Sequence, residues 1–137
     1  MKKVIIDTNL WISFLIGHQT QFVRRLLTDL RLSVFVCPEL INEIRDVASR
    51  DKISRRVTPS EVEDLMAIIY AFCQQATIIS KTPDSAIRDP KDLYLLSLAE
   101  TIDADYIVSG DADLTDLEVY RQTRIVKLVD FKQMMGY

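Results

Sequence analysis

Acidic side chains in this sequence follow segments that are predicted to be strands. Asp7 comes directly after the β-branched run of residues 4–6. A run without any polar position is typical of a strand that is buried on both faces of a parallel sheet. A carboxylate at the end of such a strand lies where open α/β sheets bind their ligands. Asp7 can also be explained as the N-cap of the helix that follows, so a binding role and a capping role both stay open.

Two later acidic pairs lie at comparable places. Asp111 and Asp113 belong to the segment SGDAD, just past an expected strand over 106–109. Asp89 and Asp92 belong to RDPKD, in the first turn of an expected helix. Each pair has a structural explanation as well, because aspartates bond their own backbone in turns and cap helices.

Glu43 is the sixth acid of interest. It lies on the expected helix after the second strand, closer to the apolar stripe than the other acids of that helix. A solvated helix flank is the structural alternative. Since the ends of neighbouring strands and the adjacent helix starts converge in one crevice, we expect carboxylates from four positions to meet there: Asp7, the pair Asp111 and Asp113, the pair Asp89 and Asp92, and Glu43.

Four carboxylates in one crevice would repel one another. Each pair at about 4 Å costs roughly 4 kcal/mol at an effective dielectric constant near 20. A cation relieves this repulsion, and an all-oxygen set without histidine or thiolate suits Mg²⁺ or Mn²⁺ better than Zn²⁺. A divalent ion with open water positions is equipped to hydrolyse phosphodiesters.

The order of the predicted elements indicates how these acids are positioned. Strands are expected over 4–6, 33–37, 76–80, 106–109 and 124–127. Helices are expected over 10–16, 21–30, 38–49, 59–75 and 89–101. A turn with a short helical piece is expected over 110–117, and Asp130 is expected to cap a terminal helix. Strands that alternate with helices favour a three-layer α/β/α fold with a central parallel sheet of about five strands. We expect one domain over residues 1–137.

Composition excludes several classes of function. The chain has 137 residues, a net charge of −3 and three glycines. It therefore has no Gly-rich phosphate loop, and as a whole it does not attract nucleic acid by its charge. The longest apolar run is too short to cross a membrane, and the first residues do not form a signal-peptide core, so a cytoplasmic protein is expected. Cys37 and Cys73 are expected to be buried free thiols, and His18 a surface residue.

Four segments resemble the sequence blocks of PIN domains, and more narrowly of the VapC-like toxins of type II toxin–antitoxin systems. They are VIIDTN, PELINEI, RDPKDLYLLSLAE and DADYIVSGDADL, followed by RIVKLVDFKQMM near the C-terminus. The resemblance covers essentially the whole chain. It implies a metal-dependent endoribonuclease that acts on single-stranded or looped RNA, works as a homodimer and is restrained by an antitoxin.

The family's functional positions can be carried over residue by residue. The resemblance implies metal binding and catalysis by Asp7, Glu43, Asp92 and Asp111, with Asp113 as an outer or second-metal ligand. Polar support is implied for Thr8, Asn9 and Ser109, where Ser109 replaces the commoner threonine. Asp89 matches a common family residue, to which we assign a capping role.

An acidic ribonuclease needs local positive charge to hold RNA. The candidate residues are Arg50, Lys52, Arg55 and Arg56, with Arg24 and Arg25 as a second patch. For an inhibitor, we expect an arginine directed into the acidic crevice and an apolar groove formed by the first helices, with Trp11, Phe14 and Phe22. Ordinary core packing is the alternative explanation of these three aromatic residues.

Three other interpretations are open. A haloacid-dehalogenase-type phosphatase needs a second aspartate where this chain has Asn9, and a response-regulator receiver needs an acidic pair at the first strand end. The third is a PIN-like module that binds RNA or protein without catalysis. Metal-dependent RNA cleavage that is lost on mutation of Asp7 distinguishes the nuclease from this module.

Overall fold

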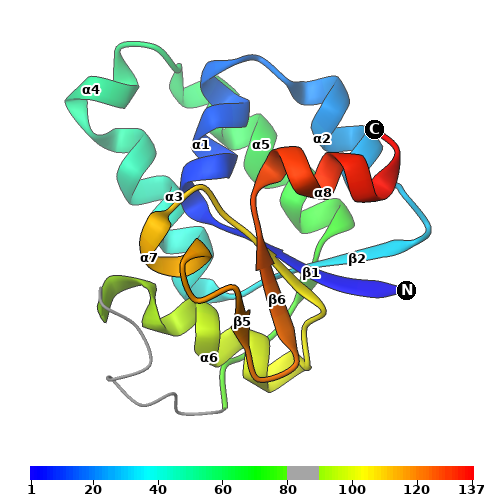
Figure 1. The fold of residues 1–137 in the computed structure, drawn as a ribbon. Coiled ribbons are helices and arrows are strands. Elements are labelled where there is room, and N and C mark those ends of the chain that lie inside the picture. The colour runs from blue at the N-terminus through cyan, green and yellow to red at the C-terminus, as the bar shows by residue number, and fades with distance from the viewer. Residues whose placement is uncertain (80–89) are drawn as a thin grey trace.

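The computed structural model describes residues 1–79 and 90–137 (Figure 1). Six strands form one sheet in the order β3-β2-β1-β4-β6-β5. The strands are β1 (Lys2–Ile6), β2 (Leu32–Val36), β3 (Gln74–Gln75), β4 (Tyr106–Val108), β5 (Val119–Tyr120) and β6 (Thr123–Val126). All neighbouring pairs are parallel except β5 with β6, which form an antiparallel hairpin.

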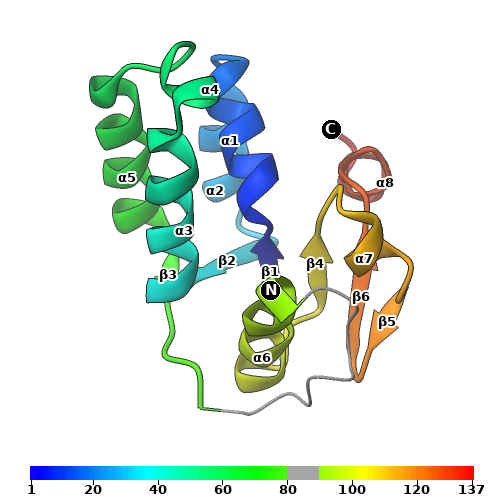
Figure 2. The same ribbon diagram turned by 90° about the vertical axis from the view of Figure 1, so that its left-hand side faces the viewer.

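Helices connect these strands in chain order. They are α1 (Thr8–Ile16), α2 (Thr20–Leu27), α3 (Pro38–Ser49), α4 (Asp51–Ser54), α5 (Pro59–Phe72), α6 (Leu93–Ile102), α7 (Ala112–Thr115) and α8 (Leu128–Met135), with a 3₁₀ turn η2 (Pro90–Asp92) before α6. In both ribbon views α6 lies on one face of β1 and β2, and α1, α2, α3 and α5 lie on the other (Figures 1 and 2). The predicted α/β/α architecture is therefore confirmed.

The centre of the sheet is the most deeply buried part of the fold. Val4, Ile5 and Ile6 of β1 are at most 2% exposed, as expected of a strand with helices on both faces. Trp11 of α1 is fully buried, and its indole nitrogen donates a hydrogen bond to the Ile6 carbonyl at 3.0 Å. This hydrogen bond connects β1 to α1 at the junction where Asp7 lies.

Local sequence signals fixed several element ends correctly. The capping box that opens α5 is present: the Thr58 hydroxyl accepts from the Glu61 N–H at 3.1 Å, and the Glu61 carboxylate accepts from the Thr58 N–H at 3.0 Å. Pro38 occupies the first position of α3, and that helix ends at Ser49, as predicted. Cys37 and Cys73 are buried and free, also as predicted.

Other element ends differ from the prediction. The strand expected over 76–80 is instead Gln74–Gln75. It begins earlier because α5 ends at Phe72. Its pairing with β2 ends with the hydrogen bond from the Ala76 N–H to the Val36 carbonyl. The helix expected over 21–30 ends at Leu27, and Leu30 is 86% exposed.

The remaining corrections concern charged segments and the sheet edge. Asp130 does not cap the last helix: its N-cap is Lys127, and Asp130 lies in the first turn. The charged segment 50–56, for which the sequence predicts a loop or a frayed helical turn, contains the four-residue helix α4. The antiparallel edge strand β5 was not predicted, because two residues are too few to carry an alternation signal.

No helix among residues 1–79 and 90–137 is long and apolar enough to span a membrane.

Candidate active site

Asp7 is held at the carboxyl edge of the sheet by its neighbouring strand. Ile6 pairs with Val108 in the parallel ladder, so Asp7 and Ser109 leave β1 and β4 side by side. The Ser109 hydroxyl donates to Asp7 Oδ2 at 2.7 Å. Asp7 occupies the N-cap position of α1, but its side chain makes no capping hydrogen bond. The carboxylate is 3% exposed and turned toward Ser109, so capping does not explain it.

The SGDAD segment continues this hydrogen-bonded chain away from the sheet. Ser109 Oγ accepts a hydrogen bond from the Asp111 N–H at 3.0 Å, and Asp111 Oδ1 accepts one from the Asp113 N–H at 2.9 Å. Asp111 thereby caps the short helix α7. The expected turn structure of these aspartates is therefore present, and it directs the Asp111 carboxylate to the Asp113 N–H.

Glu43 is connected to the first helix through a residue that sequence reasoning missed. Tyr94, the second residue of α6, donates its phenol proton to Glu43 Oε2. Its oxygen is 3.3 Å from Thr8 Oγ1, and because the phenol proton goes to Glu43, the Thr8 hydroxyl is the donor in that second contact. Burial, followed by the bond to Glu43, raises the pKa of Tyr94 well above its ordinary value. The only sequence signal was position, two residues after Asp92.

Asp92 lies where η2 passes into α6. It is the N-cap residue of α6, with no capping hydrogen bond from its side chain, and it is 8% exposed. Its Oδ2 atom is buried. The helix begins at Leu93 and not at residue 89, because η2 takes up the first turn. Asp89 lies outside the described residues. So does the segment 81–88, which the sequence predicts to be a loop.

The electrostatics of Asp7 indicate which acids come close to it. Burial is the largest cause that raises the pKa of Asp7, and the charges of Glu43 and Asp111 raise it further. Hydrogen bonds from the Ser109 hydroxyl and the Thr8 N–H act in the opposite direction. Glu43 of α3 and Asp111 of the β4–α7 turn thus lie near enough to Asp7, just before α1, for their charges to act on it at the end of β1. Figure 2 shows these elements and α6 around the end of β1.

The donor types fit a hard divalent cation, since every candidate side chain offers carboxylate oxygen. The arrangement does not yet form such a site. Across residues 1–79 and 90–137 there is no group of three or more histidine, cysteine, aspartate or glutamate side chains placed to hold a metal ion. The carboxylates are directed instead to neighbouring donors: Asp7 to Ser109, Glu43 to Tyr94, and Asp111 to the Asp113 N–H.

The two predicted basic patches lie in different surroundings. Around α4, the side chains of Arg50, Lys52, Arg55 and Arg56 are exposed, and Arg50 pairs with Asp46 at 3.0 Å. On α2, Arg25 stacks over the Tyr137 ring at 4.5 Å, and Arg24 lines a cavity. Asn9, a predicted support, is exposed at the start of α1.

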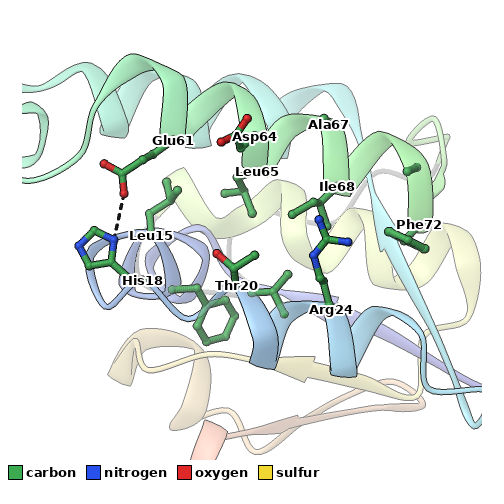
Figure 3. Close-up of a pocket in the computed structure, with 13 residues that line it drawn as sticks. Leu15, His18, Thr20, Arg24, Glu61, Asp64, Leu65, Ala67, Ile68 and Phe72 are labelled. Carbon is green, nitrogen blue, oxygen red and sulfur yellow. Dashed lines mark ion pairs between the residues drawn. The ribbon is translucent and has the colours of Figure 1, made fainter.

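That cavity, of about 580 Å³, lies between α5 and the α1–α2 pair (Figure 3). Its floor is apolar and includes Leu15, Leu65 and Ile68, and Phe72 lies at one end. At the other end His18 forms an ion pair with Glu61 at 3.0 Å. The rim therefore carries charge while the floor is apolar.

The aromatic residues predicted to form a groove play different parts. Phe14 lines the cavity. Trp11 does not, since its ring is fully buried and packs edge-on against Phe14. Phe22 packs between Phe14 and Tyr137. Phe14 therefore lines a cavity, as expected of the groove. Trp11 and Phe22 do not line it, and Trp11 at the β1–α1 junction is part of the core, which is the alternative for these aromatics.

The family model described as PIN domain matches residues 3–113. No curated protein matches the chain. Among solved structures, a chain of the crystal structure of VapBC2 from Rickettsia felis, bound to a DNA fragment from their promoter, matches with a TM-score of 0.57. The two chains are 11% identical, and the match covers 91% of this chain and 98% of that chain. At this identity the likeness shows a shared fold.

Proposed function

The chain belongs to the PIN domain family, and on that premise we propose that it is a metal-dependent endoribonuclease that cleaves single-stranded or looped RNA. Members of the family are in general nucleases that use divalent metal ions. One observation carries the proposal: Asp7 is buried at the end of β1 with the charges of Glu43 and Asp111 close enough to raise its pKa. An acid in that situation is stabilised by a cation.

We assign the cation, Mg²⁺ or Mn²⁺, to the four acids Asp7, Glu43, Asp92 and Asp111, with Asp113 as an outer or second-metal ligand. When bound, the cation would lower the pKa of a water and neutralise charge on the phosphate.

The protein's own side chains orient the metal ligands and accept the proton of the attacking water. Ser109 orients the Asp7 carboxylate through the 2.7 Å hydrogen bond to Oδ2. Asp111 or Glu43 accepts the proton of the attacking water as general base. Ser109, Thr8 and Asn9 are supporting residues, of which Ser109 and Thr8 are buried beside the acids.

For RNA binding we propose the exposed cations around α4, namely Arg50, Lys52, Arg55 and Arg56, with Arg24 and Arg25 as a second patch. Phosphate contacts of this kind supply sequence-independent affinity. In the second patch, Arg25 already contacts the Tyr137 ring and Arg24 lines the cavity. The α4 patch is therefore our first choice for the RNA-binding surface.

We further propose that the protein is the toxin of a toxin–antitoxin pair, acting in the cytoplasm as a homodimer. The fold shared with a chain of the Rickettsia felis VapBC2 structure supports this role. The antitoxin would direct an arginine to the acidic cluster formed by Asp7, Glu43, Asp92 and Asp111, because a guanidinium binds carboxylates through two parallel hydrogen bonds. Its apolar side chains would occupy the cavity between α2 and α5.

The alternative is a PIN-like module that binds RNA or protein without cleaving it. One observation favours it: the described acids are hydrogen-bonded to neighbouring donors and are not assembled as a metal site.

Cleavage of a generic single-stranded RNA separates the two functions. The nuclease requires cleavage with Mn²⁺ or Mg²⁺, none with chelator, and none with a folded Asp7→Asn variant. If the folded wild-type protein binds Mn²⁺ and RNA but leaves the RNA intact, the alternative holds.

A further inference from the structure

Tyr94 lies at the start of α6 with its hydroxyl directed to the acidic cluster. The residues that follow it in the helix, Leu95 and Leu96, are fully buried. Tyr94 itself is half-buried, and its hydroxyl contacts side chains of two other elements, α3 and α1. Side chains in a helix lean toward its N-terminus. The first turn of α6 therefore brings this phenol beside Asp92 and the end of β1.

Glu43 needs such a partner. It comes from α3, whose fully buried residues Leu40 and Ile44 fix the helix while Glu43 stays half-buried on its flank. A glutamate has three rotatable side-chain bonds, and a neighbouring acid drives it away from the cluster. Within residues 1–79 and 90–137, the Glu43 carboxylate accepts its hydrogen bond from Tyr94.

The contact also fixes Glu43 relative to Asp7. The Thr8 hydroxyl donates to Tyr94, and Thr8 directly follows Asp7 in the chain. A continuous path thus runs from Asp7 through Thr8 and Tyr94 to Glu43. A phenol suits this place because it is a neutral donor and adds no charge to a crowded acidic site.

We propose that Tyr94 is a positioning residue that holds the Glu43 carboxylate beside Asp7 for binding of a divalent cation. The inference rests on the proposed function, because it takes Glu43 to be a ligand. Hydrogen bonds to ligating carboxylates orient them, and their loss typically weakens metal binding about 10–100-fold.

Titration with Mn²⁺ tests the proposal directly. Tyr94→Phe removes only the hydroxyl, and we expect it to bind Mn²⁺ about 10–100-fold more weakly than the wild type. The matched control is Tyr106→Phe, at the beginning of β4, whose ring contacts Phe131 and Arg124. It should bind Mn²⁺ like the wild type. Excess Mn²⁺ should restore RNA cleavage by the Tyr94 variant.

A double-mutant cycle shows whether Tyr94 acts through Glu43. Glu43→Gln removes the charged carboxylate on which Tyr94 is proposed to act, and it should weaken Mn²⁺ binding. Adding Tyr94→Phe to it should cause no further loss. Additive losses would overturn the proposal. So would a Tyr94→Phe variant that binds Mn²⁺ like the wild type while Glu43→Gln is impaired, and this result would leave the nuclease function intact.

Two further measurements cover the remaining outcomes. If the wild-type protein itself binds no Mn²⁺, the metal dependence of the proposed function fails, and the role of Tyr94 fails with it. If Tyr94→Phe does not fold, the wild type can be studied with ¹³C-labelled tyrosine, its five signals assigned by phenylalanine variants of the other four. The Tyr94 Cζ signal should move on addition of Mg²⁺ in the wild type but not in Asp7→Asn. An unmoved signal overturns the proposal.

Discussion

Ser109 and Asp7 are joined by a 2.7 Å hydrogen bond although 102 positions separate them in the chain. The parallel register of β1 and β4 produces this contact, since Ile6 pairs with Val108 and the next residue of each strand lies at the same edge. A hydroxyl that donates to a buried carboxylate stabilises its charged form. Ser109 thus partly offsets the burial and the neighbouring acids that raise the pKa of Asp7.

The first prediction concerns stability against pH in the absence of metal. The folded-state pKa of Asp7 is raised, so the folded state binds this proton more tightly than the unfolded chain does. Stability should therefore fall as the pH rises from the unfolded pKa, about 3.9, through the folded one. Asp7→Asn removes this pH-dependent loss of stability, so the variant should have a higher melting temperature than the wild type at pH 7. The control Asp46→Asn, on the exposed side of α3, should not. A lower melting temperature for Asp7→Asn would contradict the prediction.

A second prediction concerns metal binding. Mn²⁺ or Mg²⁺ that binds only the folded state should raise the melting temperature, by a stabilisation of about 2.7 kcal/mol at 100 times the Kd. Asp7→Asn should show little of this response. Differential scanning fluorimetry with and without millimolar Mn²⁺ is sufficient. A wild-type melting curve that does not move would remove the support for a metal site.

A third prediction separates structure from chemistry at Asp92. Its side chain makes no capping hydrogen bond although it is the N-cap residue of α6. Asparagine is also a good N-cap, so Asp92→Asn should lose at most about 1 kcal/mol of stability. RNA cleavage should nevertheless be abolished if Asp92 binds the cation. A folded variant that still cleaves RNA would make Asp92 a structural residue.

The fourth prediction tests where RNA binds. Arg55→Ala with Arg56→Ala should weaken RNA binding and make its salt dependence less steep, by about 0.7 in the log–log slope for each phosphate that is no longer neutralised. The control pair Lys2→Ala with Arg121→Ala removes the same charge from β1 and from the β5–β6 turn. It should leave the slope unchanged. Equal slopes for the wild type and the Arg55/Arg56 variant would place RNA on another surface.

The fifth prediction concerns the antitoxin. Phe72 lines the cavity and is 40% exposed, so Phe72→Asp should be tolerated by the fold but should prevent an apolar segment from binding. Tyr70, on the same helix and 49% exposed, does not line the cavity. Co-expression with the neighbouring gene product should therefore restore growth for Tyr70→Asp but not for Phe72→Asp. If folded, metal-loaded wild-type protein expressed alone is harmless, the toxin role is contradicted and the nuclease is not.

Much of the fold followed from local patterns. The β-branched run before Asp7, the proline that opens α3 and the capping box at Thr58 each act within a few residues, and all were confirmed. Elements whose ends depend on pairing or packing were less predictable. The positions of β3 and β5 are set by hydrogen bonds to β2 and β6. The sequence of a two-residue strand does not indicate which strand it pairs with.

The candidate site likewise has features that the sequence predicts and features that it does not. By itself the sequence determined which acids stand at strand and helix ends, because charge placement and periodicity are local properties. Only the tertiary structure decided which groups meet: Ser109 with Asp7 through strand register, and Tyr94 with Glu43 through the packing of α6 beside α1 and α3. These contacts join residues 102 and 51 positions apart. The physical reason is that such contacts depend on how the buried faces of separate elements pack, which the spacing of residues along the chain does not specify.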